Sequence, residues 1–307
     1  MTRRLLLLAL SACSLFNACA ADDKTATRLA DLKIGGGEIQ VDELAGSYAV
    51  TRDETVHWVE TAARAVTHYY GRFPVAHLHL LIEPRNGRGR ASGTTYGSED
   101  GGFIRIGLGT MATAADLKDD WVMTHEMVHL AFPQMEDEHH WIEEGLATYV
   151  EPLARAEIGE LTPEYVWKET VEGMPNGLPA AGDRGLDKTP TWGRTYWGGA
   201  LFCLLADVEI RERTHDRYGL RDALEGILKA GGNIQTTADI EYAFKTGDEA
   251  VGVPVLTELY TQMKGTPVTT DLDALWKKLG VIYKDGATSF DDKAPDAAIR
   301  KAMTAAD

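Results

Sequence analysis

The most constraining feature of this sequence is the run His-Glu-Met-Val-His at residues 125–129. On a helix, the four-residue step from His125 to His129 is about one turn, so both imidazoles leave the same face. Two neutral imidazoles on one face can hold a zinc ion, and Glu126 lies beside them, placed to act as general base toward a metal-bound water. Acidic residues before the run and Pro133 after it suit a helix. The run therefore predicts a helix that carries a zinc site.

Length and charge narrow the class of protein. A chain of 307 residues can bury a large core and form one large domain or two lobes. With 44% hydrophobic and 25% charged residues, its composition is ordinary for a soluble protein. The formal net charge of -16 makes the chain a poor candidate for binding nucleic acid or an anionic membrane surface.

The first twenty residues have the layout of a secretory signal. Arg3 and Arg4 precede an apolar run at residues 5–10, and small residues follow. The apolar run is too short to cross a membrane. We therefore expect residues 1–20 to be a signal peptide and the protein to be exported, either to the periplasm or as a secreted protein.

Three processing sites compete in this segment. Ala18-Cys19-Ala20 is an A-x-A-like cleavage site, and residues 10–13 resemble a bacterial lipobox that would place a lipid on Cys13. A lipid on Cys19 is the third alternative. Such a lipid is the only membrane attachment that the sequence suggests. Cys203 lies in an apolar run and is expected to be a core residue.

Hydrophobic periodicity predicts a small mixed segment before the zinc helix and helices after it. The expected early elements are strands at residues 35–41, 47–50, 77–82 and 103–108, a helix at 54–70, and a glycine-rich basic loop at 85–93. The expected later helices are at residues 195–214, 220–230, 237–246, 255–264 and 271–279. An exposed edge strand just ahead of the zinc helix could bind an extended peptide by backbone pairing.

A third zinc ligand is expected from a second helix, at residues 141–152. An antiparallel neighbour of the zinc helix could present a carboxylate to the two histidines, and Glu143 and Glu144 are the candidates. Because adjacent residues on a helix point about 100° apart, only one of the two can serve. His139 and His140 precede this helix and are expected to be loop residues.

The combination of these two helices resembles a known family. The pattern H-E-x-x-H, followed after a short connector by W-x-x-E-G-x-A-x-Y-x-E, is similar to the gluzincin metallopeptidases, closest to the glycyl aminopeptidase and aminopeptidase N families. The resemblance implies that Glu144 joins His125 and His129 as the third zinc ligand. Glu151 lies two turns beyond Glu144 and is predicted to hydrogen-bond a ligand histidine; the alternative is an exposed acid at the helix end.

The resemblance continues at residues 195–214, which are similar to the Y-x-K-G-x-L helix of the same families. It implies that Tyr196 donates a hydrogen bond to the oxyanion formed during peptide hydrolysis; the alternative is a packing role at the helix start. Asp207 needs a partner if it is buried in this apolar helix. The G-x-M-E-N strand that recognises a free amino terminus in aminopeptidases is not found.

Together these observations predict an α+β fold with a thermolysin-like zinc peptidase catalytic domain. A small mixed lobe is expected at residues 21–118, a mostly helical zinc-peptidase lobe at 119–283, and a polar tail at 284–307. The expected protein is an exported zinc metallopeptidase, in which Glu126 activates a zinc-bound water to hydrolyse a peptide or protein substrate. Two alternatives stay open: a catalytically inactive zinc-binding pseudo-peptidase, and a zinc hydrolase of a non-peptide substrate.

Overall fold

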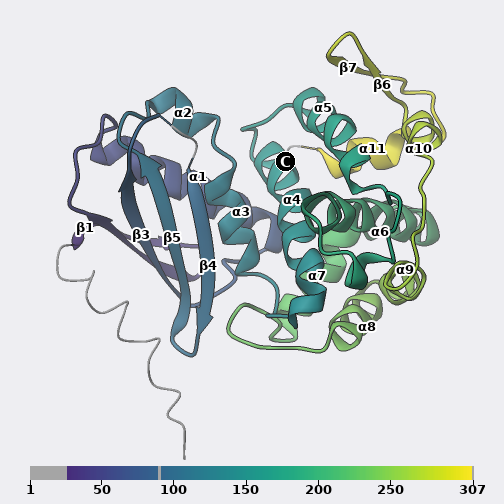
Figure 1. The fold of residues 1–307 in the computed structure, drawn as a ribbon, viewed down its shortest axis with the longest axis horizontal. Coiled ribbons are helices and arrows are strands. Elements are labelled where there is room, and N and C mark those ends of the chain that lie inside the picture. The colour runs from purple at the N-terminus through teal and green to yellow at the C-terminus, as the bar shows by residue number, and fades with distance from the viewer. Residues whose placement is uncertain (1–25, 89–90, 306–307) are drawn as a thin grey trace, which may run out of the picture.

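The computed structural model describes residues 26–88 and 91–305, which form a β-sheet lobe beside a helical lobe (Figure 1). This arrangement agrees with the predicted small mixed lobe followed by a mostly helical one. The predicted signal peptide at residues 1–20 lies outside the described residues. Within the described ranges, no helix is both long and apolar enough to span a bilayer.

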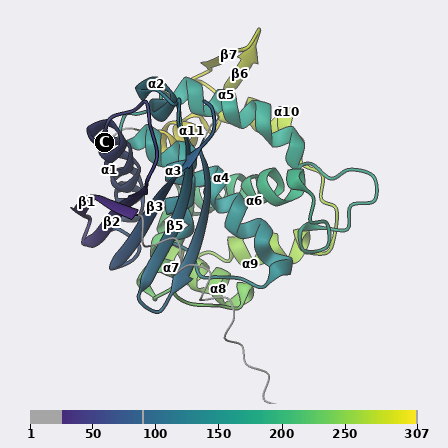
Figure 2. The same cartoon turned by 60° about the vertical axis from the view of Figure 1, so that its left-hand side comes forward.

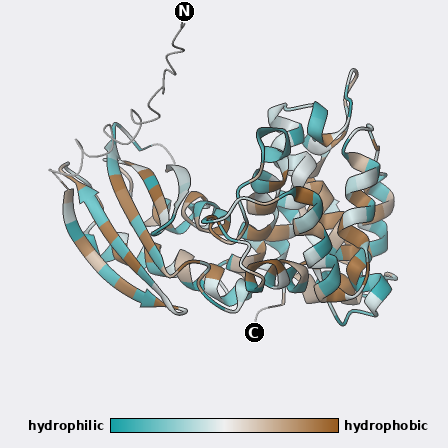
Figure 3. Cartoon of the chain, turned by 90° about the horizontal axis from the view of Figure 1, so that it is seen from below, coloured by the Kyte–Doolittle hydropathy of each residue, from teal (hydrophilic) through white to brown (hydrophobic). Residues whose placement is uncertain are grey.

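The sheet has five strands, which the chain does not visit in spatial order. They are β1 (Ala26–Ile34), β2 (Gly37–Leu44), β3 (His77–Arg85), β4 (Ser92–Ser98) and β5 (Gly101–Gly109), in the order β1-β2-β3-β5-β4. The three central strands are parallel, whereas β1 and β4 pair antiparallel at the two edges. Apolar and polar residues alternate along the strands (Figure 3), because one face packs against helices and the other faces solvent.

Several strand predictions need correction. Residues 47–50 form no strand, and β1 lies where none was predicted. The edge strand beside the zinc helix is β4, whereas the predicted strand at residues 103–108 lies inside the sheet as part of β5. The predicted loop at 85–93 is interrupted because β4 starts at Ser92. β4 has the sequence Ser-Gly-Thr-Thr-Tyr-Gly-Ser. It lacks the alternating apolar residues from which a strand is predicted.

One long helix, α1 (Arg52–Tyr70), fixes the two lobes relative to each other, and it agrees with the predicted helix at 54–70. Thr51 and Glu54 form a capping box at its start, and Gly71 ends it in the left-handed conformation, with φ of 69°. Its buried face contacts β1 in the sheet lobe and both α3 and α4 in the helical lobe.

The helical lobe places the zinc helix between the sheet and the other helices. A short α2 (Ala114–Lys118) leads into it, and the helices are α3 (Val122–His129), α4 (His140–Glu157), α5 (Pro163–Gly173), α6 (Gly199–Thr214), α7 (Leu220–Lys229), α8 (Ile240–Val251), α9 (Val255–Met263) and α10 (Leu272–Leu279). Cys203 is fully buried in α6, as predicted. The buried Asp207 finds its partners in the hydroxyl of Tyr149 (2.8 Å), Nε of Arg211 (2.8 Å) and the backbone N–H of Leu220 (2.9 Å).

The C-terminal residues differ from the predicted polar tail at 284–307. They form a hairpin of β6 (Val281–Lys284) and β7 (Ala287–Phe290), which lies next to α5 (Figure 2), and then α11 (Ala297–Met303). The guanidinium of Arg300 is buried and donates to the carbonyls of Leu279 (3.1 Å) and Gly280 (3.0 Å), at the end of α10. Ala297, Ile299 and Met303 are buried beside it, so the short helix packs through apolar residues as well as this guanidinium.

Candidate active site

The predicted zinc helix, which is α3, is short and almost wholly buried. Asp120 starts it, because its carboxylate accepts a hydrogen bond from the backbone N–H of Met123 at 3.0 Å. Burial raises the pKa of Asp120 to about 6. His125 and His129 leave the same face of this helix, with their ring centroids 5.0 Å apart. The predicted one-turn spacing is therefore present.

Glu144 of α4 meets these two histidines. Its Oε2 lies 3.1 Å from His125 Nε2 and 3.7 Å from His129 Nε2. One ligand atom from each of the three residues lies within 4.8 Å of the others. A metal ion could therefore touch all three residues at once.

The charges of these residues suit a metal site. Burial, helped by the neighbouring His125, lowers the pKa of His129 to about 3, so its imidazole is neutral and keeps a free lone pair. Burial opposes ionisation of Glu144, but hydrogen bonds from His125 and His140 outweigh it and lower the pKa of Glu144. Neutral imidazole together with ionised carboxylate is a donor set that zinc accepts.

The neighbouring acid, Glu143, is engaged elsewhere. Its carboxylate accepts a hydrogen bond from the backbone N–H of Met135 at 3.2 Å and lies 3.2 Å from His140 Nδ1. His140 also reaches Glu144, with its Nε2 3.3 Å from Glu144 Oε1. The structure thus places Glu144, not Glu143, against the histidines. It also brings His140, expected in a loop, to the start of α4 and to the site.

Glu126 is held by the edge strand. The hydroxyl of Thr95 on β4 donates to Glu126 Oε2 at 2.7 Å. Burial raises the pKa of Glu126, while this hydrogen bond opposes the rise. Gly93, two residues earlier on the same face of β4, lies so close that an added Cβ would be 2.3 Å from Glu126 Cγ. Sequence reasoning missed both β4 residues, because neither carries a recognisable motif.

Tyr196 lies on a π-helical turn at Gly193–Gly198, just before α6, rather than on the regular helix predicted from residue 195. Its ring stacks on that of His125, with centroids 6.4 Å apart and an interplanar angle of 19°. Burial and the nearby charge of Glu144 raise the pKa of Tyr196 to about 12, so the hydroxyl stays protonated and can donate a hydrogen bond.

The residue after Tyr196 packs closely against α5. Trp197 lies directly against Gly173, where an added Cβ would be 1.8 Å from the indole ring. π-helical turns occur frequently at functional sites. Here the turn aims the tyrosine at the histidines and the tryptophan into the helical lobe.

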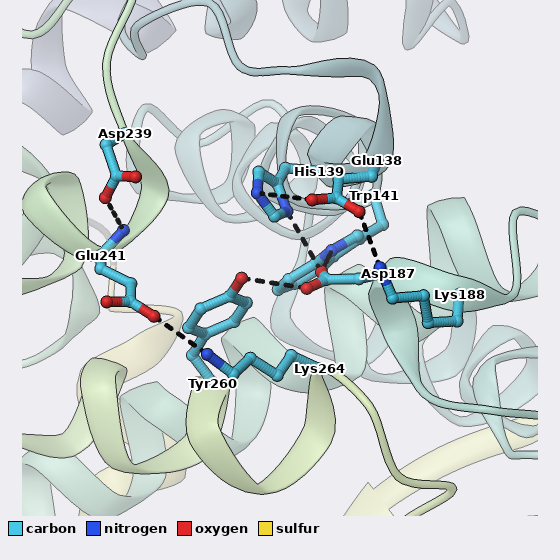
Figure 4. A network of polar contacts seen from close by, with 9 residues as sticks. All are labelled: Glu138, His139, Trp141, Asp187, Lys188, Asp239, Glu241, Tyr260 and Lys264. Atoms are coloured by element: carbon cyan, nitrogen blue, oxygen red, sulfur yellow. Dashed lines mark hydrogen bonds and ion pairs between the residues drawn. The ribbon is translucent and has the colours of Figure 1, made fainter.

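The loop before Tyr196 is tied to the helical lobe by Asp187 (Figure 4). The Asp187 carboxylate accepts hydrogen bonds from Trp141 Nε1 (2.8 Å) and the Tyr260 hydroxyl (2.9 Å), and it lies 3.2 Å from His139 Nδ1. His139 is therefore part of this network rather than of the metal site.

The prediction for Glu151 needs correction. Its carboxylate is buried and accepts a hydrogen bond from Nη1 of Arg155 at 2.8 Å, one turn further along α4. Arg155 also donates to the carbonyl of Lys118 at 3.0 Å. Within the described residues, Nδ1 of His125 has no hydrogen-bond partner. Glu151 is thus neither bonded to a ligand histidine nor exposed at the helix end.

These residues share a cleft of about 750 Å³ between the lobes. One wall is β4, which contributes every residue from Ser92 to Gly97. The side chains at the centre are those of the candidate site: His125, Glu126, His129, His140, Glu143, Glu144 and Tyr196. The cleft can therefore present an unpaired strand edge, a metal site and an acid to one extended substrate.

The chain shares its fold with M1 zinc metallopeptidases. No protein-family model and no curated protein matches the sequence. Among solved structures, an M1 zinc metallopeptidase from Deinococcus radiodurans matches 80% of this chain, with a TM-score of 0.52 at 17% identity. An aminopeptidase N family protein from Idiomarina loihiensis matches 84%, with a TM-score of 0.61 at 13% identity. This chain covers only about half of each, 52% and 49% respectively.

Proposed function

We propose that this chain is an exported, thermolysin-like zinc metallopeptidase. The observation that carries the proposal is the convergence of His125, His129 and Glu144 within 4.8 Å, in a cleft that also holds the buried Glu126. The fold shared with M1 zinc metallopeptidases supports it. A purely structural zinc site usually has four protein ligands and no need of an adjacent base.

The residues present fit a zinc ion, which His125, His129 and Glu144 would hold. Two histidines and one carboxylate are a common ligand set of catalytic zinc, in which one position stays open. When bound, zinc supplies a Lewis acid that polarises a carbonyl and makes water more acidic. His140 would orient the Glu144 ligand, because it contacts the second oxygen of the Glu144 carboxylate.

Glu126 acts as the general base in this proposal. It accepts a proton from the attacking water and passes that proton to the leaving amine. Its raised pKa suits both steps, because the group must bind and release the same proton. The hydrogen bond from Thr95 orients the carboxylate before substrate arrives.

Tyr196 acts as the oxyanion donor. Its hydroxyl stays protonated at neutral pH, because its pKa is raised to about 12. A donor fixed in advance stabilises the negative charge that develops on the carbonyl oxygen. The π-helical turn and the packing of Trp197 hold it in place.

The substrate in this proposal is an extended peptide. β4 pairs with β5 along one edge, and its other edge borders the cleft. Backbone N–H and C=O groups on such an edge can pair with a peptide strand. This would place the peptide backbone across the site, whatever its side chains.

Export rests on the sequence of residues 1–20, and we propose a periplasmic or secreted location on that basis. A lipid on Cys13 or Cys19 would anchor the protein to a membrane. Mass spectrometry of the mature N-terminus tests this: a free Ala21 supports a soluble protein, a lipidated cysteine an anchored one, and a retained Met1 contradicts export.

The catalytic proposal is tested by the metal content of the mature protein and its cleavage of an unbiased peptide mixture, with Glu126→Gln as the control. We expect one zinc per chain, and cleavage that is lost in the variant while zinc is retained, because the change removes the base but no ligand. Zinc without cleavage would favour the pseudo-peptidase or a non-peptide substrate. Protein without zinc would contradict the proposal.

A further inference from the structure

Two tryptophans stand out because they are exposed. Trp121 is 37% exposed and Trp192 is 64% exposed, whereas Trp58, Trp141 and Trp276 are at most 8% exposed. A tryptophan in the core is stabilised by burying its large apolar surface. Trp121 and Trp192 leave much of their apolar surface exposed to water. A bound substrate that covers this surface would therefore bind more tightly.

Both exposed tryptophans border the candidate site. The ring of Trp121 meets that of His125 edge to face, at a centroid distance of 5.1 Å. The ring of Trp192 lies against that of Tyr196, at 6.3 Å and an interplanar angle of 30°. Because Tyr196 stacks on His125, the four rings form one row, which we call the aromatic row: Trp121, His125, Tyr196 and Trp192.

The aromatic row runs along the reaction centre. Trp121, His125 and Tyr196 line the cleft, and Trp192 extends the row beyond them to the surface. A substrate whose scissile carbonyl reaches Tyr196 would have Trp192 beside it, because the rings of Trp192 and Tyr196 are neighbours. Aromatic rings prefer stacked or edge-to-face partners and gain energy beyond simple area burial. Aliphatic side chains gain from the area alone.

The charges around the aromatic row disfavour a substrate with an acidic side chain at this position. Glu126, Glu143 and Glu144 all line the same cleft. An additional carboxylate from the substrate would meet repulsion in a partly desolvated space. Glu143 and Glu144 are already paired with His140, so a basic side chain would have to compete for them.

We propose that the aromatic row is a specificity subsite, which binds an aromatic or large aliphatic side chain next to the scissile bond of a peptide. This inference rests on the proposed peptidase function and names the substrate class that the site prefers. Trp192 binds the side chain at one end of the row, while the neighbouring Tyr196 acts on the adjacent carbonyl.

The first test compares matched peptides that differ in one residue beside the cleaved bond. We expect kcat/KM for phenylalanine or leucine to exceed that for alanine or aspartate by about 10-fold or more. Trp192→Ala should lower the ratio of kcat/KM for the phenylalanine peptide to that for the alanine peptide about 10-fold, whatever it does to the common rate through its contact with Tyr196. Trp192→Phe should restore most of the loss.

The control is Tyr242→Ala on α8. Tyr242 is 65% exposed and Trp192 is 64% exposed, but only Trp192 has its ring against that of Tyr196. Tyr242→Ala should leave kcat/KM unchanged for both peptides. The zinc content of the Trp121→Ala protein must be measured together with its activity. Trp121 contacts His125, so this change could also weaken metal binding.

A second test does not depend on turnover. Binding of the phenylalanine and alanine peptides to the Glu126→Gln protein, measured by calorimetry, should favour phenylalanine, and Trp192→Ala in that background should remove the preference. If the wild type cleaves no peptide, the proposed function fails, and the binding ratio still decides this inference. Equal binding or cleavage of both peptides, a preference for lysine or arginine, or a preference that survives Trp192→Ala would overturn it.

Discussion

The contact between β4 and Glu126, the proposed general base, makes Gly93→Ala an informative substitution. An alanine Cβ at this position would lie 2.3 Å from Glu126 Cγ and 2.6 Å from its Cδ. Cβ atoms essentially never approach another atom to less than 3.0 Å, so relieving the 2.3 Å contact by moving the side chain of Glu126 requires a retreat of about 0.7 Å. The carboxylate is buried and held by Thr95, so this retreat breaks a hydrogen bond rather than moving a free chain end.

The size of the effect follows from that displacement. Misplacing a catalytic group by about 1 Å can cost about 100-fold in rate. We therefore expect Gly93→Ala to lower kcat about 100-fold with zinc still bound, because no proposed ligand is touched. The fold should survive, because Gly93 has no left-handed φ and the three nearest atoms to its added Cβ all belong to the side chain of Glu126.

The assay is peptide hydrolysis under saturating substrate, with zinc content and thermal unfolding measured on the same protein. Gly265→Ala is the matched control, because nothing lies within 4 Å of its added Cβ and its φ is not left-handed. It should behave as wild type. Full activity in Gly93→Ala would refute the role of β4 in placing Glu126, and loss of zinc would show that the clash disturbs α3 instead.

Three further predictions concern other parts of the site. Glu144→Ala should lose zinc affinity by one or two orders of magnitude or more while Glu143→Ala retains it, as measured by competition with a chelator; the opposite result would assign the ligand to Glu143. Tyr196→Phe should lower kcat about 100- to 1,000-fold with little change in KM, and an unchanged kcat would leave it only a packing role. Asp120 has a pKa raised to about 6, so the folded chain holds its proton more tightly than the unfolded chain and loses stability as the pH rises from about 4 to 6. Relative to wild type, Asp120→Asn should therefore gain up to about 3 kcal/mol in unfolding free energy between pH 4 and pH 7, measured in urea; a pH-independent difference would contradict this.

The centre of the site could be predicted from the sequence because its geometry is local. The step from His125 to His129 fixes one helix face, and the choice of Glu144 came from the family pattern. The structure brings these residues together and turns Glu143 away. For Glu151 the sequence leaves two alternatives, a bond to a ligand histidine and an exposed acid at the helix end. The structure shows a local partner instead, because Arg155 lies four residues later on the same helix.

Other parts of the site depend on tertiary contacts that no periodicity encodes. β4 has almost no apolar residues, so neither the strand nor the role of Thr95 could be read from hydrophobicity. The π-helical turn under Tyr196 depends on Trp197 packing against Gly173 of α5, over twenty residues away in the sequence. The C-terminal helix is only seven residues long, with its few buried residues, Ala297, Ile299, Arg300 and Met303, set among polar ones, so periodicity gives it little signal.

The close approach of α4 and α6 has a consequence for how this protein can change over evolution. Gly145 and Gly199 touch through their main chains, since a Cβ on Gly145 would lie 2.4 Å from the carbonyl carbon of Gly199. Gly145 follows Glu144, and Gly199 follows the turn that carries Tyr196. The distance between Glu144 and Tyr196 is thus set by the contact of two backbones. Substitutions of the surrounding core side chains can therefore accumulate without altering it. Conversely, neither glycine tolerates replacement, so this pair should be among the slowest-changing positions in any set of related sequences.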